Sequence, residues 1–395
     1  MNPPASEAAP AWSRPSLAQV LLEWGRIGCI GFGGPPTHIK LLRDLCVDRE
    51  GWLDAAEFED AVATCSLLPG PASTQLAIFC AWRVRGRAGA LIGGAAFIVP
   101  GLIVILALAA LFLAGSPPRW VLGAGAGAGA AVAAVAVQAA WSLIPASRKR
   151  AREAGSIWRW IAYLAGGAAA AAAIGPWLVL VLLGAGLTEF SIQRAHARDP
   201  AAHGIMVIPL LAAGTVSSGV LLSVAWVAFK VGALSFGGGF VIIPLMQADA
   251  VSHYHWMTGG QFLDAVALGQ ITPGPVVQTV AAVGYAAAGL TGGLLASVVA
   301  FTPSFAFILL GARRFDRLRG NQQARAFLDG AGPAAIGAIL GASVTLTRAL
   351  TQPWQYAVLA AAAILLLVLR RGAVITLLAA AAAGILIALA GGPLP

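Results

Sequence analysis

Charged residues are scarce in this sequence, at 10% of 395 residues, whereas 59% of the residues are hydrophobic. Soluble globular domains carry about 25% charged residues, so the composition excludes an ordinary soluble protein. Apolar segments with almost no charge recur along the chain, and runs of about 18 residues or more are long enough to cross a bilayer core. The clearest cores of such segments are 102–113, 121–144, 177–187, 294–310, 356–369 and 374–389.

Residues that carry enzyme or metal chemistry are also few. The four cysteines have no CxxC spacing, and the five histidines are scattered. No G-x-x-x-x-G-K-[ST] phosphate loop, HExxH or G-x-S-x-G motif occurs. We therefore predict no enzyme, no cofactor and no metal site.

The net charge of +9 does not indicate nucleic-acid binding, because the basic residues lie in short loops between apolar segments, where they set membrane orientation. The lipid bilayer is the predicted partner, with no nucleic acid. Residues 1–15 are polar and rich in Pro and Ala without a signal-peptide pattern, and we expect them to form a disordered tail.

An internal repeat organises the chain. The segment around Phe32 recurs around Phe236, a shift of 236 − 32 = 204 residues. In this register the pairing runs without a gap from Arg26 to Phe97, and it predicts homologous halves at 16–192 and 215–395 with a linker at 193–214. The matched pairs include Trp52 with Trp256, Phe58 with Phe262, Pro69-Gly70-Pro71 with Pro273-Gly274-Pro275, Gly89 with Gly293 and Phe97 with Phe301.

Loop charges predict how the halves are oriented. The loop at 83–87 contains three arginines, whereas the equivalent loop at 286–291 has no charge, and one segment later the bias is reversed at 313–319. Because Lys and Arg mark the cytoplasmic side, the halves are predicted to have inverted topology. We expect an all-α polytopic membrane protein with about ten to twelve transmembrane or re-entrant segments. Whether each Pro-Gly-Pro segment crosses once or folds back stays open.

The two Pro-Gly-Pro motifs predict broken helices at matching positions. Proline interrupts a helix, and a break at membrane depth is tolerated where it lines a cavity or is buried in protein. A helix that restarts after such a break offers free N–H groups to an anion. The alternative is a structural kink without a ligand. The candidate substrate-binding residues here are Pro69, Gly70, Pro71, Ser73, Thr74, Gln75, Pro273, Gly274, Pro275, Gln278 and Thr279.

Glycine pairs at Gly33-Gly34 and Gly237-Gly238 are further substrate-binding candidates. Consecutive glycines can form an anion nest of N–H groups, although close helix packing is the alternative. Packing is our interpretation of the Gly/Ala alternation at 123–129.

Matching ionisable residues complete the candidates. Arg26 and Lys230 occupy the same repeat position, and intramembrane cations indicate function. We hypothesise that they converge on one dianion; the alternatives are an ion pair of Arg26 with Glu23 and interfacial snorkelling of Lys230. Asp60 and Asp264 also match and are proton-coupling candidates, with helix N-capping as the alternative.

The motifs together resemble the chromate ion transporter family. The resemblance rests on Phe32-Gly-Gly-Pro35, His38, Trp52, Phe58 and Leu68-Pro-Gly-Pro71, with a second copy from Phe236 to Pro275 in which Gly239 replaces the proline. It covers nearly the whole chain, as in the long two-domain members. It implies a multi-pass protein of the bacterial plasma (inner) membrane that exports chromate, confers resistance, and is driven by the proton-motive force or by anion exchange.

Other functions remain open at this point. Sulfate is an isosteric dianion, so a carrier of sulfate or another oxyanion is one alternative to a chromate exporter. A non-transporting membrane scaffold is another, although it would not need paired helix breaks or paired cations. A homodimer is a possible assembly.

Overall fold

The computed structural model describes residues 15–113, 117–173, 178–196, 219–235, 242–311 and 321–395, and every regular element within them is a helix. The predicted all-α class is confirmed. Residues 1–14, most of the predicted linker and the second glycine pair lie outside the described residues. The first half comprises α1 (Leu17–Ile30), α2 (Pro35–Arg43), the π-helical η1 (Asp44–Arg49), α3 (Ala55–Cys65), α4 (Ala72–Phe112), α5 (Arg119–Glu153), α6 (Ile157–Ala173) and α7 (Leu178–His196).

The second half repeats this order of helices, including a π-helical turn at the same repeat position. Its elements are α8 (Val220–Leu234), α9 (Ile242–Gln247), the π-helical η3 (Ala248–His253), α10 (Gly259–Ile271), the 3₁₀ turn η4 (Val276–Gln278), α11 (Thr279–Gly311), α13 (Gln322–Arg348), α14 (Pro353–Ala363), the π-helical η6 (Ile364–Val368) and α15 (Ala373–Leu389).

Long apolar helices make the chain a polytopic membrane protein. Among the described residues, 5 helices are long and apolar enough to cross a bilayer, which takes about 20 residues. They are Ala72–Phe112, Arg119–Glu153, Leu178–Ala195, Val276–Gly311 and Gln322–Arg348.

The chain turns back on itself at the first Pro-Gly-Pro. Helix α4 has a sharp bend at Gly86, where φ is +62°, a conformation that costs glycine little. The bend separates a short arm, residues 72–84, from the rest of the helix. Glu57 near the start of α3 forms an ion pair with Arg83 near the end of this arm, so α3 and the short arm run antiparallel as a hairpin.

The second Pro-Gly-Pro is followed by the same bend. Ala288 and Gly289 of α11 have φ values of −150° and +61°, close to those of Arg85 and Gly86 in α4. Both Pro-Gly-Pro motifs therefore precede a short helical arm and a reversal. These reversals favour the folded-back alternative, and the number of membrane crossings stays a prediction.

The two bends correct the repeat register. Gly86 and Gly289 are 203 residues apart, not 204. Gly89 and Gly292 are also 203 residues apart and have equivalent surroundings. A Cβ at Gly89 would lie 2.2 Å from the Ala81 carbonyl oxygen, and one at Gly292 would lie 2.2 Å from the Gly284 carbonyl oxygen. The ungapped register to Phe97 is therefore wrong beyond Pro-Gly-Pro. The second half is one residue shorter there, where the tighter 3₁₀ turn η4 replaces the first residues of the helix. Gly89 pairs with Gly292, not Gly293, and Phe97 with Ala300, not Phe301.

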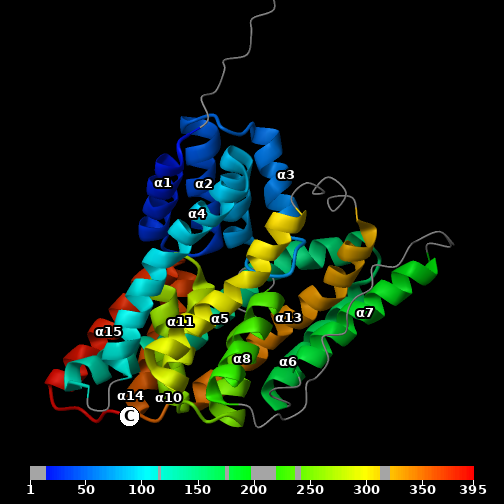
Figure 1. Ribbon diagram of the computed structural model, residues 1–395. Coiled ribbons are helices and arrows are strands. Elements are labelled where there is room, and N and C mark those ends of the chain that lie inside the picture. The colour runs from blue at the N-terminus through cyan, green and yellow to red at the C-terminus, as the bar shows by residue number, and fades with distance from the viewer. Residues whose placement is uncertain (1–14, 114–116, 174–177, 197–218, 236–241, 312–320) are drawn as a thin grey trace, which may run out of the picture.

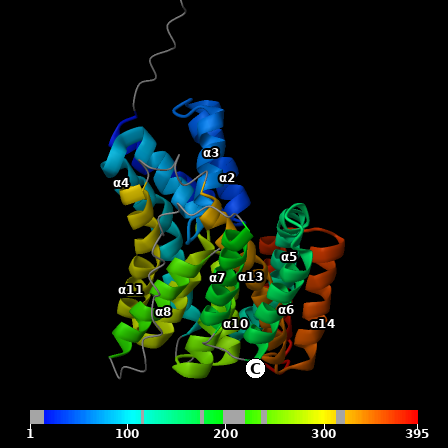
Figure 2. The ribbon, with the colours of Figure 1, turned by 90° about the vertical axis from the view of Figure 1, so that its right-hand side faces the viewer.

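The C-terminal helices of the two halves interlock, as Figures 1 and 2 show. Helix α5 packs against α14 and α15 of the other half, and α13 packs against α6 and α7. Glycines permit the close approach: a Cβ at Gly127 would lie 2.2 Å from the Ala380 carbonyl oxygen of α15. The packing interpretation of 123–129 is confirmed.

Corresponding elements of the halves lie toward opposite ends of the molecule. Helices α2 and α3 lie at the upper end in both Figure 1 and Figure 2, and α10 lies at the lower end with the C-terminus. The arginine-rich bend of α4 is at the upper end, beside Leu309 near the end of α11. This arrangement is the one that inverted repeats produce; the orientation in a membrane stays a prediction.

Candidate functional site

The two Pro-Gly-Pro tips meet at the junction of the halves. Between them lies a cavity of about 10 Å³, a volume that holds about one water molecule at most. A tetrahedral oxyanion does not fit in this volume unless the tips move apart. The cavity is lined by Pro35, Pro71, Ala72 and Ser73 from the first half and Pro275, Val276 and Val277 from the second.

Three helical segments begin at this cavity. Pro35 is the first residue of α2, Ala72 is the first residue of α4, and Val276 begins η4, which leads into α11. The first N–H groups of a helix have no intrahelical acceptor and lie at the positive end of the helix dipole. The free N–H groups come from α4 and η4, because α2 begins with two prolines, which have no N–H, and its Thr37 N–H donates to the Gly34 carbonyl. The N-termini of α4 and η4 therefore make the junction suitable for an anion.

Each tip packs on the first helix of the opposite half. The Gly274 N–H donates a hydrogen bond of 3.0 Å to the Gly31 carbonyl at the end of α1. A Cβ at Gly274 would lie 3.7 Å from the Gly28 carbonyl oxygen, and one at Gly70 would lie 3.3 Å from the Gly232 carbonyl oxygen of α8. Because Gly28 and Gly232 occupy the same repeat position, the two contacts are related by the repeat.

The predicted special backbone of the glycine motif is present. Gly33 and Gly34 have φ values of +98° and +77°, in the left-handed region. Gly34 precedes the first turn of α2, whereas Gly33 is exposed. The equivalent candidates Gly237 and Gly238 lie outside the described residues.

Three buried polar atoms without a partner, on Thr74, Gln75 and Ser304, lie at the first tip. Gly70 lies close to Ser304, whose Oγ would be 3.3 Å from a Cβ there, and Gln75 Nε2 donates a 2.7 Å hydrogen bond to the Pro69 carbonyl. Buried polar groups are normally hydrogen-bonded, and an exception requires a ligand, a water molecule or strain. Within the described residues the unpartnered buried atoms are Thr74 Oγ1, Gln75 Oε1, Ser235 Oγ, Gln270 Nε2 and Ser304 Oγ.

Two other predicted residues are satisfied within the protein. Gln278 donates from Nε2 to the Ile98 carbonyl at 3.0 Å and accepts from Ser297 at 3.1 Å, so it ties the second tip to α4. The Thr279 hydroxyl donates to the Val276 carbonyl at 2.8 Å. Neither lines the cavity, and both stabilise the tip that does.

His38 lies directly behind the cavity. Its side chain is fully buried, with Nε2 2.9 Å from the Gly31 carbonyl oxygen, Nδ1 3.1 Å from Ser73 Oγ and the ring edge against Phe97. His38 is part of the family motif but was not among the predicted site residues. Its position four residues after Gly34, on the helix that begins at the cavity, was the available signal. Ser304, beside Gly70, was missed as well.

The expected convergence of two cations is not found. Lys230 Nζ lies 2.6 Å from Asp249 Oδ2 in a pair whose side chains are only 12% and 5% exposed. Arg26 is paired with Glu23 at 3.9 Å, with its side chain 60% exposed, as the ion-pair alternative proposed. Neither cation lines the cavity. The correction for Lys230 arises because its partner Asp249 is on η3, which follows α9 and lies beyond the run from 220 to 240.

The candidate proton-coupling carboxylates do not cap their helices. Asp54 accepts from the Glu57 N–H at the start of α3, and Thr258 caps α10 at the matching position. The capping alternative is therefore wrong for both. Asp60 is partly buried on α3. Asp264 lies within α10 against the glycine face of α5, where a Cβ at Gly125 would be 2.7 Å from its Oδ1.

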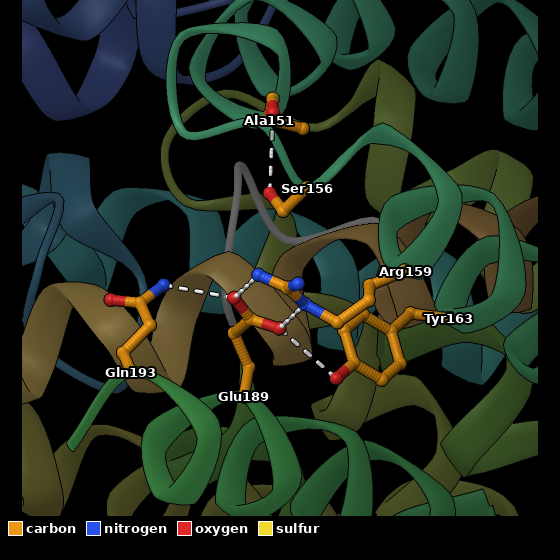
Figure 3. Close-up of polar contacts among 6 residues, drawn as sticks. All are labelled: Ala151, Ser156, Arg159, Tyr163, Glu189 and Gln193. Atoms are coloured by element: carbon orange, nitrogen blue, oxygen red, sulfur yellow. Dashed lines mark hydrogen bonds and ion pairs between the residues drawn. The ribbon is translucent and has the colours of Figure 1, made fainter. Parts of the chain in front are cut away.

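A polar cluster of the first half lies outside the junction. Figure 3 shows Arg159 and Tyr163 of α6 and Gln193 of α7 pointing toward Glu189 of α7. Arg159 donates two hydrogen bonds to Glu189, at 2.8 and 3.0 Å. Glu189 has a 1% exposed side chain and also accepts from Tyr163 and Gln193. This cluster joins the two helices and is fully satisfied.

The geometry defines a class of protein: a polytopic membrane protein built from two repeats, with broken helices meeting at their junction. The family model for the chromate transporter matches residues 18–189 and 222–385, within the two predicted halves. The chain belongs to the chromate transporter family.

Curated relatives agree with this assignment. The chain is 31% identical over 337 residues to a "Chromate transport protein" of Cupriavidus metallidurans, covering 84% of this chain and 83% of the relative. It is 32% identical over 348 residues to a "Probable chromate transport protein" of Synechococcus elongatus, covering 86% of each. It is 30% identical over 348 residues to a "Chromate transport protein" of Pseudomonas aeruginosa, covering 84% and 82%. No solved structure matches the chain.

Proposed function

We propose that this protein is a secondary transporter that exports chromate across the bacterial plasma membrane and thereby confers chromate resistance. The proton-motive force or exchange with another anion drives the export. The observation that carries the proposal is the junction, where three helix N-termini meet beside unpartnered buried hydroxyl and amide groups. The names of the relatives support chromate as the substrate.

The junction selects an oxyanion through hydrogen bonds. Helix N-termini and uncharged donors such as Ser73 can replace the hydration shell of a tetrahedral dianion. Since the cavity has a volume of only about 10 Å³, binding requires the tips to separate. Alternating access arises when the halves separate first on one face and then on the other.

Asp264 supplies a position for proton coupling. Its carboxyl group contacts the glycine face of α5, and no hydrogen-bond or ion-pair partner occurs for it in the described part of the chain. An isolated carboxylate is costly in a low-dielectric interior, so proton binding and release at Asp264 would accompany the movement of α10 against α5.

The test is chromate flux in proteoliposomes with an imposed pH gradient, for wild type, Thr74→Val and Thr64→Val. The Thr74 hydroxyl has no partner, so its removal is expected to leave stability nearly unchanged and to reduce flux roughly fivefold or more, a loss of about 1 kcal/mol or more. The Thr64 hydroxyl donates to the Asp60 carbonyl one helical turn away and serves as the matched control, with flux retained.

Competition decides the substrate. We expect chromate to be carried in preference to sulfate, which would compete weakly. Preferred sulfate transport would identify an oxyanion carrier for which chromate is opportunistic. Absence of flux for both anions in correctly inserted protein would support a scaffold and end the proposal.

A further inference from the structure

Ser73 and His38 form a polar contact at the wall of the cavity. Ser73 is the second residue of α4 and lines the cavity, and His38 lies behind it between α1 and α4. The Ser73 hydroxyl therefore faces both the space available to an anion and an imidazole that can accept a proton. This arrangement goes beyond helix N-termini, because one of its members can change charge.

The hydrogen-bond partners define which ring nitrogen carries a proton. The Gly31 carbonyl can only accept, so the 2.9 Å contact to His38 Nε2 requires an N–H at Nε2. In the neutral ring Nδ1 is then bare, and it accepts the Ser73 O–H at 3.1 Å. The serine proton is directed at the histidine and away from the cavity.

Protonation reverses the second hydrogen bond. In the imidazolium form Nδ1 also carries a proton and donates to Ser73 Oγ. The Ser73 hydroxyl proton is released from the histidine and can donate to an oxygen atom in the cavity. A single proton on His38 thus converts Ser73 from a donor to the protein into a donor to the substrate.

The surroundings of the ring link this proton to an anion. From α1 the ring contacts the Gly31 carbonyl, and from α4 it contacts the Ser73 hydroxyl and the Phe97 ring. No charged side chain contacts the ring in the described part of the chain. On α1, Arg26 is 60% exposed and paired with Glu23, and Lys40 of α2 is exposed. A buried imidazolium lacks a protein counter-ion here, so an anion beside Ser73 would supply one.

The geometry points to His38 as the residue that couples proton binding to oxyanion binding, with Ser73 as the group that transmits the change. This inference rests on the proposed transport of an oxyanion through the junction. It adds the binding-linked proton, which is distinct from the proton proposed for Asp264.

The coupling is present in one half only. A shift of 204 places Ile242 at the position of His38, and the second half lines the cavity with Val276 and Val277 where the first has Ser73. The Gly31 carbonyl, however, accepts from both His38 Nε2 and the Gly274 N–H. The histidine therefore shares an acceptor with the opposite tip and is placed to respond when that tip moves.

The test is the pH dependence of chromate binding to purified full-length protein, with proton uptake recorded in weakly buffered solution. The protonation equilibrium of free chromate is measured in parallel and subtracted. We expect the wild-type affinity for chromate to fall by up to about tenfold per pH unit once the pH is high enough to deprotonate His38 in the free protein. In that range, binding should be accompanied by proton uptake. His38→Gln keeps a donor near the Gly31 carbonyl but cannot be protonated, and it should remove both the corrected pH slope and the proton uptake.

Two further variants separate the contributions. Ser73→Ala keeps the histidine and should weaken chromate binding at low pH and flatten the slope, because the released hydroxyl proton is absent. His255→Gln changes an exposed histidine and should behave as wild type.

A wild-type pH slope of affinity and wild-type proton uptake in His38→Gln, or a wild-type pH slope in Ser73→Ala, would overturn the coupling. If wild type binds no chromate, the proposed substrate is wrong; labelled sulfate, which stays a dianion over this range, then tests the same coupling with the same variants.

Discussion

The two halves have the same backbone arrangement at their tips but different side chains there. Both have a first helix that ends in a Gly-rich motif, a Pro-Gly-Pro tip and a bent helix with nearly the same φ and ψ at Gly86 and Gly289. At the cavity, however, the first half has Ser73 backed by His38, and the second has Val276 and Val277. The common backbone builds a symmetric junction, and the unequal side chains place the proton-responsive chemistry on one side of it.

The matched cations Arg26 and Lys230 show the same divergence. The first belongs to an exposed group with Glu23 and Arg49, whereas the second forms a buried pair with Asp249 and lies 5.7 Å from the Trp226 ring. Equivalent repeat positions therefore do not have equivalent roles. The charge of Lys230 is used within the protein, which leaves helix N-termini and hydrogen-bond donors to attract the anion.

The largest expected effect comes from breaking the buried pair. Lys230→Ala leaves the 5% exposed Asp249 carboxylate without its cation, and we expect a loss of about 3–5 kcal/mol in the free energy of unfolding. Arg26→Ala, at the matching position on the surface, should cost about 0–1 kcal/mol. Reversible unfolding in mixed micelles measures both.

A double variant distinguishes pairing from a direct role of Lys230 in transport. Lys230→Ala with Asp249→Ala removes both charges and should recover most of the lost stability. Flux should return with it. Restored stability with no flux would show that Lys230 itself is needed for the substrate, and it would reinstate the cation in the site.

The matched carboxylates provide the next comparison. Asp264→Asn should reduce uptake driven by a pH gradient roughly tenfold, within the about 5–150-fold range of a coupling free energy of 1–3 kcal/mol, while chromate exchange without a gradient continues. Asp60→Asn, on the partly buried face of α3, should have little effect. Equal losses in the two variants, or a loss of exchange in Asp264→Asn, would contradict a coupling role for Asp264 that Asp60 does not share.

The repeat and the helix breaks could be predicted from sequence because both depend on local residue identity. Proline interrupts a helix whatever its surroundings, and two ungapped copies of the motif indicate two related tips. The single-residue deletion after Pro273-Gly274-Pro275 escaped notice because Gly89 has a glycine at either shift and Phe97 has a phenylalanine, Phe301, at the shift of 204. It became visible only through the backbone angles at Gly86 and Gly289.

The site was harder to predict because its partners are distant in sequence. The contacts of His38 with Ser73 and of Gly274 with Gly31 span 35 and 243 residues (274 − 31). Neither follows from periodicity or spacing. The ion pair of Lys230 likewise depends on the packing of η3 against α8. A residue run without acidic neighbours was an insufficient reason to treat the lysine as free.

The smallest expected effect concerns the two bends. The bend of α4 lines a hollow of about 580 Å³ with Arg83, Arg85 and Arg87, and the equivalent bend at Gly289 has no charged residue. An arginine-lined hollow raises the local concentration of anions and speeds their association.

Arg85→Gln with Arg87→Gln should slow chromate entry from this side roughly two- to fivefold at low ionic strength, and the difference should fade near 1 M salt, where the Debye length is about 3 Å. Flux in vesicles of defined orientation measures it, with Arg148→Gln on α5 as the control. A slowing that persists at high salt would show that the two arginines act through structure, and the asymmetry of the bends would then have no part in collecting the substrate.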